Sequence, residues 1–256
     1  MKSRRRGPVA VGVLLALGVA CTGSSGDELD LSAPDESPFA DIDSEGVVRD
    51  TSHRADMFHV AQATGATLVV RSTPREGAEE IATLTAAEEV SGMVVCLVSQ
   101  ELGDWVAVYL PTGPADTVGW VERDDVTLSR HRYRIEIDRT AHSLTVFNGT
   151  TTELTAPVAI GPDAPPPGAR LFIKDLVATP DPLGPYGSYA YGLSGSFNDL
   201  AAFTAGQGVV ALHGTNDLTT LGLDIDHGSV AADPAAITNL VETVGLPLGT
   251  PVEVSG

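Results

Sequence analysis

Residues 211–230 read ALHGTNDLTTLGLDIDHGSV and contain two short histidine motifs, His213-Gly214-Thr215 and His227-Gly228-Ser229. Ser229 follows His213 by sixteen residues, with Gly228 directly before it. This spacing is expected where two adjacent strands bring a general base beside an attacking hydroxyl group. The motifs therefore predict an acyl-transfer site built on neighbouring strands.

The sequence before these motifs is typical of β-structure. Residues 133–138 alternate between apolar and polar side chains, and residues 143–147 continue the alternation. Asn148-Gly149 is a strong hairpin signal ahead of a further strand at 150–158. We expect this part of the chain to open with a β-meander.

The remaining segments of this half are more varied. Residues 162–168 contain four prolines and interrupt the pattern, which resumes at 171–173. Residues 178–206 are rich in Gly, Pro, Ser and Tyr, which predicts a long surface loop. Apolar residues at helical spacing predict one helix at 235–244, and a last strand follows at 250–254.

The first half of the chain also predicts β-structure. Short β-branched runs occur at residues 66–71, 80–84, 89–99, 105–110 and 118–121. Residues 103–108 and 118–121 resemble the end of a bacterial SH3-like domain. Trp105 and Trp120 in these segments favour either a stacking surface for wall glycan or peptide, or packing of the indole rings in the core.

The N-terminus is typical of an exported bacterial lipoprotein. A basic start precedes an apolar run that ends at Cys21, so residues 1–21 are predicted to be a lipoprotein signal peptide with Cys21 as the lipidated residue. The alternative is an ordinary cleaved signal peptide. Residues 22–55 are acidic and poor in large apolar side chains, which predicts a disordered tether. We expect a protein anchored to the outer face of the cytoplasmic membrane.

Charge and cysteine content limit the possible partners. Removal of residues 1–20 leaves 11 basic against 34 acidic residues, a net charge of about −23. Such a chain is not expected to bind nucleic acid, and its membrane contact would be through the lipid anchor only. Cys96, the second of the two cysteines, lies in an apolar run and is predicted to be a buried, inert thiol.

Residues 131–256 resemble the catalytic domain of the L,D-transpeptidases, the YkuD-like family. The matching pieces occur in family order: Tyr133 to Ile137, Val158 to Gly161, Gly184-Pro185-Tyr186-Gly187, His213-Gly214-Thr215-Asn216, Leu221-Gly222, His227-Gly228 and Gly249-Thr250-Pro251-Val252. The resemblance implies a ping-pong acyl transfer on peptidoglycan stem peptides, without a cofactor or a metal. An SH3-like domain at 56–129 is a familiar partner of such a domain.

The resemblance also assigns roles to single residues. His213 matches the general base and Ser229 the nucleophile, a position where the family normally has cysteine. His227 and Gly228 match the motif that shapes the backbone oxyanion site. Gly214 and Thr215 fall in the same substrate region, where Thr215 would support the strand of the base.

Three interpretations follow for this site. Ser229 acts as the nucleophile of a serine-type acyltransferase or carboxypeptidase, or the site is inactive and binds stem peptides, or the domain is a structural or regulatory module. A Ser-His-Asp triad with Asp226 and a zinc site formed by His213, His227 and Asp226 are further formal alternatives. The expected fold is all-β, an SH3-like barrel followed by an L,D-transpeptidase-like β-sandwich with one helix.

Overall fold

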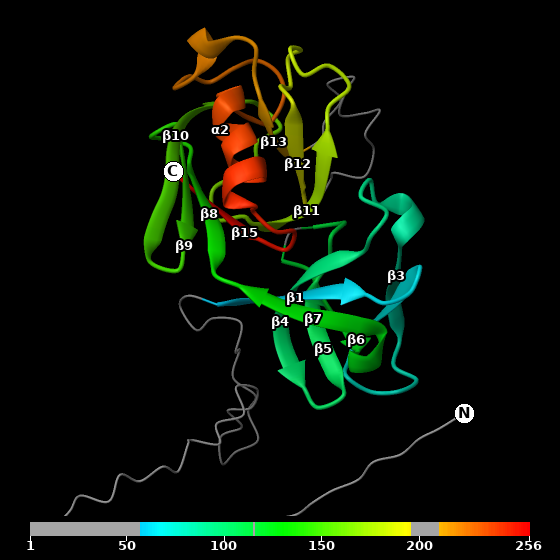
Figure 1. Ribbon diagram of the computed structural model, residues 1–256. Helices are drawn as coiled ribbons and strands as arrows, with labels where there is room; N and C mark the ends of the chain where they lie inside the picture. Colours follow the sequence, from blue (N-terminus) through cyan, green and yellow to red (C-terminus); the bar gives the residue numbers. More distant parts are fainter. Residues whose placement is uncertain (1–56, 115, 196–209) are drawn as a thin grey trace, which may run out of the picture. The chain divides into compact units, whose positions relative to one another are not determined.

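The computed structural model describes residues 57–114, 116–195 and 210–256, and these residues fall in one compact unit (Figure 1). The predicted signal peptide with Cys21, the predicted tether at 22–55 and the end of the predicted loop at 178–206 lie outside the described residues. Within the described ranges, no helix is long and apolar enough to cross a membrane.

The described residues form two sheets whose strands are mainly antiparallel, so the predicted all-β class is confirmed. The first sheet has seven strands in the order β3-β2-β6-β5-β4-β1-β7. Its strands are β1 (Phe58–Ala63), β2 (Thr67–Arg71), β3 (Glu80–Thr85), β4 (Val95–Leu102), β5 (Trp105–Tyr109), β6 (Val118–Glu122) and β7 (Val126–His131). Short 3₁₀ turns, η2 (Ala86–Glu88) and η3 (Arg123–Asp125), lie between them.

The second sheet closes into a barrel in the order β10-β14-β13-β12-β11-β15-β8-β9. Its strands are β8 (Tyr133–Asp138), β9 (Ser143–Asn148), β10 (Thr151–Ile160), β11 (Arg170–Ala178), β12 (Tyr189–Leu193), β13 (Ala211–Gly214), β14 (Val230–Ala232) and β15 (Pro251–Ser255). One 3₁₀ turn, η4 (Leu218–Thr220), one α-helix, α2 (Pro234–Asn239), and a π-helical turn, η5 (Leu240–Val244), complete the described part.

The first sheet follows the predicted β-branched runs, with one correction. The predicted strand at 89–99 begins only at Val95, because the preceding residues turn back through the hydrogen bond from Gly92 N to Glu89 O (3.0 Å). Residues 129–131, where the predicted SH3-like domain ends, belong to β7 and pair along β1. Cys96 is fully buried, and burial raises the pKa of its thiol, so the prediction of a buried cysteine is confirmed.

The two predicted roles of the tryptophans in the first sheet, a stacking surface or core packing, both stay predictions. Trp105 and Trp120 are both half-buried on the paired strands β5 and β6. Trp105 lines an acidic hollow of about 240 Å³ together with Glu76, Asp104, Glu122, Arg123 and Asp124. The assignment of this sheet to the SH3-like class stays a prediction.

The barrel confirms the predicted meander and corrects the predicted loop at 178–206. Residues 189–193 form β12, which pairs with β11 on one side and with β13 on the other. The sequence pattern does not predict this strand, because Ala190 and Gly192 carry no large side chain. Burial of Tyr191 and Leu193 in the barrel core stabilises it instead.

The predicted helix at 235–244 corresponds to α2 and η5 and is confirmed. The Asp233 side chain accepts a hydrogen bond from Ala235 N, and Pro234 occupies the first turn, a favourable N-terminus. The helical segment ends at Gly245, whose φ is +64°. Ile237 and Leu240 are buried in the barrel core, and α2 packs against β12 and β13, next to the histidine motifs.

Candidate acyl-transfer site

Adjacent strands of the barrel bring the two histidine motifs together. β13 carries His213, β14 follows Ser229, and the two strands pair in parallel with Leu212 opposite Val230 and His213 opposite Ala231. The prediction that neighbouring strands unite the motifs is therefore confirmed. Leu212 and Val230 point into the barrel core, which fixes the register of the pair.

His213 is held as a neutral ring with one nitrogen directed at the serine motif. Its Nδ1 lies 2.6 Å from Gly214 O, and because a carbonyl only accepts, Nδ1 carries the proton and Nε2 is the acceptor. Nε2 faces the second motif, since a Cβ placed on Gly228 would lie 3.7 Å from it. Burial and, to a smaller extent, the nearby His227 lower the pKa of His213 to about 4, although the hydrogen bond to Gly214 O opposes the shift. The ring is thus neutral at neutral pH, with its proton on Nδ1.

Tyr186 and Gly187 support the histidine strand from the preceding loop. The Tyr186 ring meets the His213 ring edge-on at a centroid distance of 5.2 Å, and Tyr186 O accepts a hydrogen bond from Gly214 N (2.9 Å). A Cβ on Gly214 would lie 2.9 Å from the Cα of Gly187, so the two glycines allow the close approach of the segments. Sequence reasoning quoted this loop for its resemblance but did not place Tyr186 at the site.

Backbone hydrogen bonds from Gly161 and Asp163 hold the turn before Ser229 in place. Gly161 N donates to Ser229 O (2.6 Å), and Asp163 N donates to Gly228 O (3.0 Å). Gly228 has a φ of +74°, which favours glycine, and a Cβ on Gly161 would lie 2.1 Å from Gly228 O. Sequence reasoning missed both Gly161 and Asp163 as site residues, because both contribute backbone groups, which a motif search does not select.

The Ser229 side chain is almost completely buried, with 1% of the residue exposed. Among the described residues, the hydrogen bond recorded for Ser229 Oγ goes to Asp163 O at 3.5 Å and not to His213. A bond of that length is weak. The resting hydroxyl is therefore directed at a backbone carbonyl, while His213 Nε2 lies near the adjacent Gly228.

Asp226 and His227 lie outside this buried arrangement. Asp226 Oδ1 is 2.6 Å from His227 Nδ1, and both side chains are exposed, by 97% and 79%. The hydrogen bond to His227 lowers the pKa of Asp226. A triad of Ser229, His213 and Asp226 does not form, because Nδ1 of His213 is bound to the carbonyl of Gly214. Across the described ranges, no three His, Cys, Asp or Glu side chains are grouped as a metal site.

This arrangement agrees with the comparison to known families. Residues 132–254 match the L,D-transpeptidase catalytic domain, YkuD. The domain thus includes the barrel, the histidine motifs and α2. No curated protein matches the chain.

Several solved structures are similar to part of the chain. Bd1075 of Bdellovibrio bacteriovorus is 23% identical over 48% of this chain and 47% of that chain, with a TM-score of 0.36. An L,D-transpeptidase of Xylanimonas cellulosilytica is 17% identical over 48% of this chain and 59% of that chain, also with a TM-score of 0.36. An L,D-transpeptidase from Mycobacterium tuberculosis is 16% identical over 56% of this chain and 67% of that chain, with a TM-score of 0.39. The chain covers about half of the length of the first two proteins.

Thr215 and its neighbours line a hollow beside β13, the strand that carries His213. Thr215 Oγ1 accepts a hydrogen bond from Asp217 N (3.1 Å), which starts the turn into η4. The hollow has a volume of about 380 Å³, and it is lined by Pro182, Leu183, Gly184, Thr215, Asn216, Leu218, Asp233, Pro234 and Ala235. Thr215 directly follows β13, and its predicted support of that strand stays a prediction.

Proposed function

We propose that residues 132–254 carry out L,D-transpeptidase-type acyl transfer on peptidoglycan stem peptides, with Ser229 as nucleophile and His213 as general base. The observation that carries this proposal is the direction of His213: its Nδ1 proton is fixed on Gly214 O, and its Nε2 faces Gly228, next to Ser229. A neutral, oriented imidazole beside a hydroxyl is the arrangement that nucleophilic acyl transfer needs.

The reaction proceeds in two displacements. Ser229 Oγ attacks the amide carbonyl of the stem peptide while its proton passes to His213 Nε2. The C–N bond then breaks, and His213 returns the proton to the leaving amine. An acceptor amine or water attacks the resulting ester, loses its proton to His213, and releases Ser229 with its hydroxyl restored. Backbone groups around His227, Gly228 and Ser229 would stabilise the negative oxygen of each tetrahedral intermediate.

The serine makes the first displacement slow. A cysteine beside a histidine can be deprotonated before attack, whereas a serine hydroxyl must lose its proton during attack itself. Because burial lowers the pKa of His213 to about 4, protonation of this base is unfavourable. Ser229→Cys is therefore expected to acylate faster than the parent protein.

A second candidate function is binding of stem peptides without turnover. The contact from Ser229 Oγ to Asp163 O favours it, because this contact directs the hydroxyl to a backbone acceptor rather than to the base. The hollow next to Thr215 would then serve as part of a recognition surface.

The wider setting is also a proposal. The YkuD match supports action on the cell wall, and the N-terminal sequence supports export, with Cys21 as lipid anchor, residues 22–55 as tether and an SH3-like module at 56–129. Metabolic labelling with a fatty acid tests the anchor, since label on the parent should disappear in Cys21→Ala.

Intact-mass measurement tests the function. The full chain in detergent is incubated with a stem tetrapeptide or with a carbapenem, beside Ser229→Ala and Ser229→Cys. An adduct on the parent that is absent from Ser229→Ala supports serine-dependent acyl transfer. An adduct on Ser229→Cys alone rejects it and supports the binding function.

A further inference from the structure

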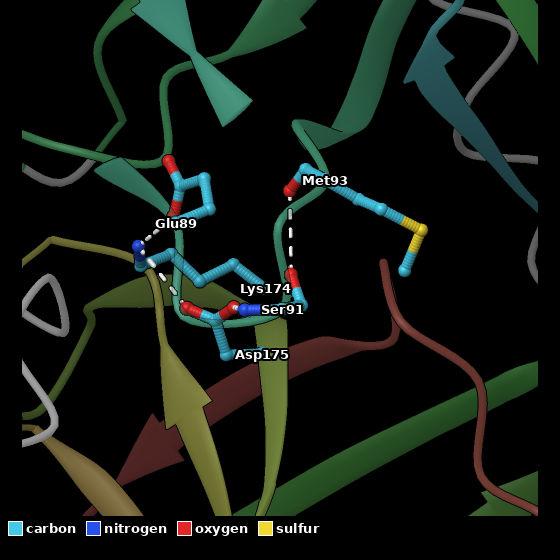
Figure 2. A network of polar contacts seen from close by, with 5 residues as sticks. All are labelled: Glu89, Ser91, Met93, Lys174 and Asp175. Carbon is cyan, nitrogen blue, oxygen red and sulfur yellow. Dashed lines mark hydrogen bonds and ion pairs between the residues drawn. The ribbon is translucent and has the colours of Figure 1, made fainter. Parts of the chain in front are cut away.

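The loop before β4 contacts the YkuD barrel through buried polar groups (Figure 2). Glu89 Oε2 forms an ion pair with Lys174 Nζ, which also lies 3.3 Å from Asp175 Oδ2. Ser91 N donates a hydrogen bond to Asp175 Oδ1 (2.7 Å). We call residues 89–91 the bridging loop, because Glu89 and Ser91, which precede β4 of the first sheet, contact Lys174 and Asp175 on β11 of the barrel.

The bridging loop meets an irregular part of β11. Lys174 is 1% exposed and Asp175 is 0% exposed, although successive side chains of a regular strand point to opposite faces. The register of β11 against β12 shifts between Ile173 and Asp175, a bulge that turns both side chains to the same loop. The bulge therefore accounts for two adjacent charged residues in one buried network.

The charges in this network are interdependent. Two carboxyl groups share one ammonium, and burial raises the pKa of Glu89 even though Lys174 opposes the shift. Loss of one partner would leave a buried charge without compensation, which is strongly unfavourable. The network thus selects one arrangement of the bridging loop on the barrel.

Val90, the central residue of the bridging loop, packs on an apolar cluster next to His213. Val90 packs with Tyr186 against the cluster of Val177, Ala190 and Ala211. Ala190 on β12 is paired with His213 on β13, and the ring of Tyr186 lies edge-on to that of His213. Val90 and Tyr186 consequently pack on the same cluster, and His213 contacts this group through its pairing with Ala190 and the ring of Tyr186.

We infer that the bridging loop is a positioning element for His213: Glu89 and Ser91 hold it on Lys174 and Asp175, and Val90 holds the cluster that supports Tyr186 and the imidazole ring. The loop touches neither substrate nor reacting atoms. Its effect on the reaction rests on the proposed function, whereas its effect on the orientation and titration of the His213 ring does not.

Long-range ¹H–¹⁵N spectra of the His213 imidazole in the full chain test this inference without any turnover. Val90→Ala and Glu89→Gln are compared with two matched controls in the first sheet, half-buried Val69→Ala and exposed Glu79→Gln. We expect both loop variants to shift the His213 midpoint upward by about one pH unit or more and to mix its two tautomers, because water reaches a loosened ring. The control variants should leave the His213 signals at the parent positions.

Rescue separates positioning from general destabilisation. Val90→Ile keeps an apolar side chain on the cluster and should restore the parent spectrum, while Val90→Ala and Val69→Ala lose comparable stability. Parent-like His213 signals in both loop variants would overturn the inference, even if the parent forms an adduct. If Glu89→Gln fails to fold, Val90→Ala and Val90→Ile decide the outcome alone. Shifted His213 signals in a protein that forms no adduct would sustain the inference and reject the catalytic proposal.

Discussion

The two histidine motifs of the barrel share the letters His-Gly but differ in surroundings. His213 is 5% exposed, bound to a backbone carbonyl through Nδ1 and flanked by an aromatic ring. The His227 side chain is 79% exposed and is paired with the Asp226 carboxylate, which is 97% exposed. The difference teaches that the two histidines are not distinguished by their sequence motif. They are distinguished by burial and by the backbone hydrogen bond on Nδ1, which orients the other ring nitrogen of His213.

The largest expected effect is the difference in acylation rate between variants of the two histidines. His213→Gln removes the base, so acylation of Ser229 should fall by about 10²–10⁴-fold, the usual contribution of general-base catalysis. His227→Gln should change the rate by less than about tenfold. Time-resolved intact mass with a carbapenem measures both. Equal losses in the two variants would remove the distinction between the motifs.

A second prediction concerns the turn that places Ser229. Gly161→Ala would put a methyl group 2.1 Å from Gly228 O, so we expect a loss of about 3 kcal/mol in the free energy of unfolding. Gly65→Ala is the control, because its nearest neighbour would be Thr67 O at an ordinary 3.6 Å. Urea denaturation compares the two variants. A Gly161→Ala protein as stable as the control would contradict the described packing at the serine turn.

The pH dependence of stability follows from the lowered pKa of His213. The unfolded chain takes up the proton near pH 6.5 and the folded chain only near pH 4, so the stability from this group is lost as the pH falls through that window. The full loss is about 3 kcal/mol for a shift of this size. Urea titrations of the parent from pH 7 to 4 should show this slope, and His213→Gln should reduce it, leaving the contribution of His131, whose pKa burial also lowers to about 4. His227→Gln should keep the parent slope.

The smallest effect is expected at the exposed pair. Asp226→Asn removes the carboxylate beside His227, and because both side chains are exposed, the urea midpoint at pH 7 should not change measurably. The acylation rate should also stay within about twofold of the parent rate. A large loss of rate would instead assign the Asp226–His227 pair a part in the reaction.

The sequence predicted the fold where side-chain patterns are strong. The alternation at 133–138 corresponds to β8, the Asn148-Gly149 signal to the β9–β10 hairpin, and the apolar spacing at 235–244 to α2 and η5. It failed at β12, because a strand paired on both sides needs few large side chains. It also failed at residues 89–94, where the chain turns before β4 begins at Val95.

The candidate site was predictable in part. His213, Gly228 and Ser229 were selected by residue type and spacing, and Gly214 and Thr215 by the resemblance to the L,D-transpeptidases; pairing of β13 with β14 brings the two motifs together. Tyr186, Gly161 and Asp163 were not selected, because their contribution is a ring edge, a missing side chain and backbone hydrogen bonds. The bridging loop was also beyond prediction, since Glu89 and Lys174 are 85 residues apart and meet only in the folded chain.

An NMR titration of the His213 ring in the parent protein tests the central claim most directly. The account predicts a neutral ring above pH 5, a proton on Nδ1 and a midpoint near pH 4. A proton on Nε2, or a midpoint at the ordinary histidine value of about 6.5, would contradict a buried base directed at Ser229.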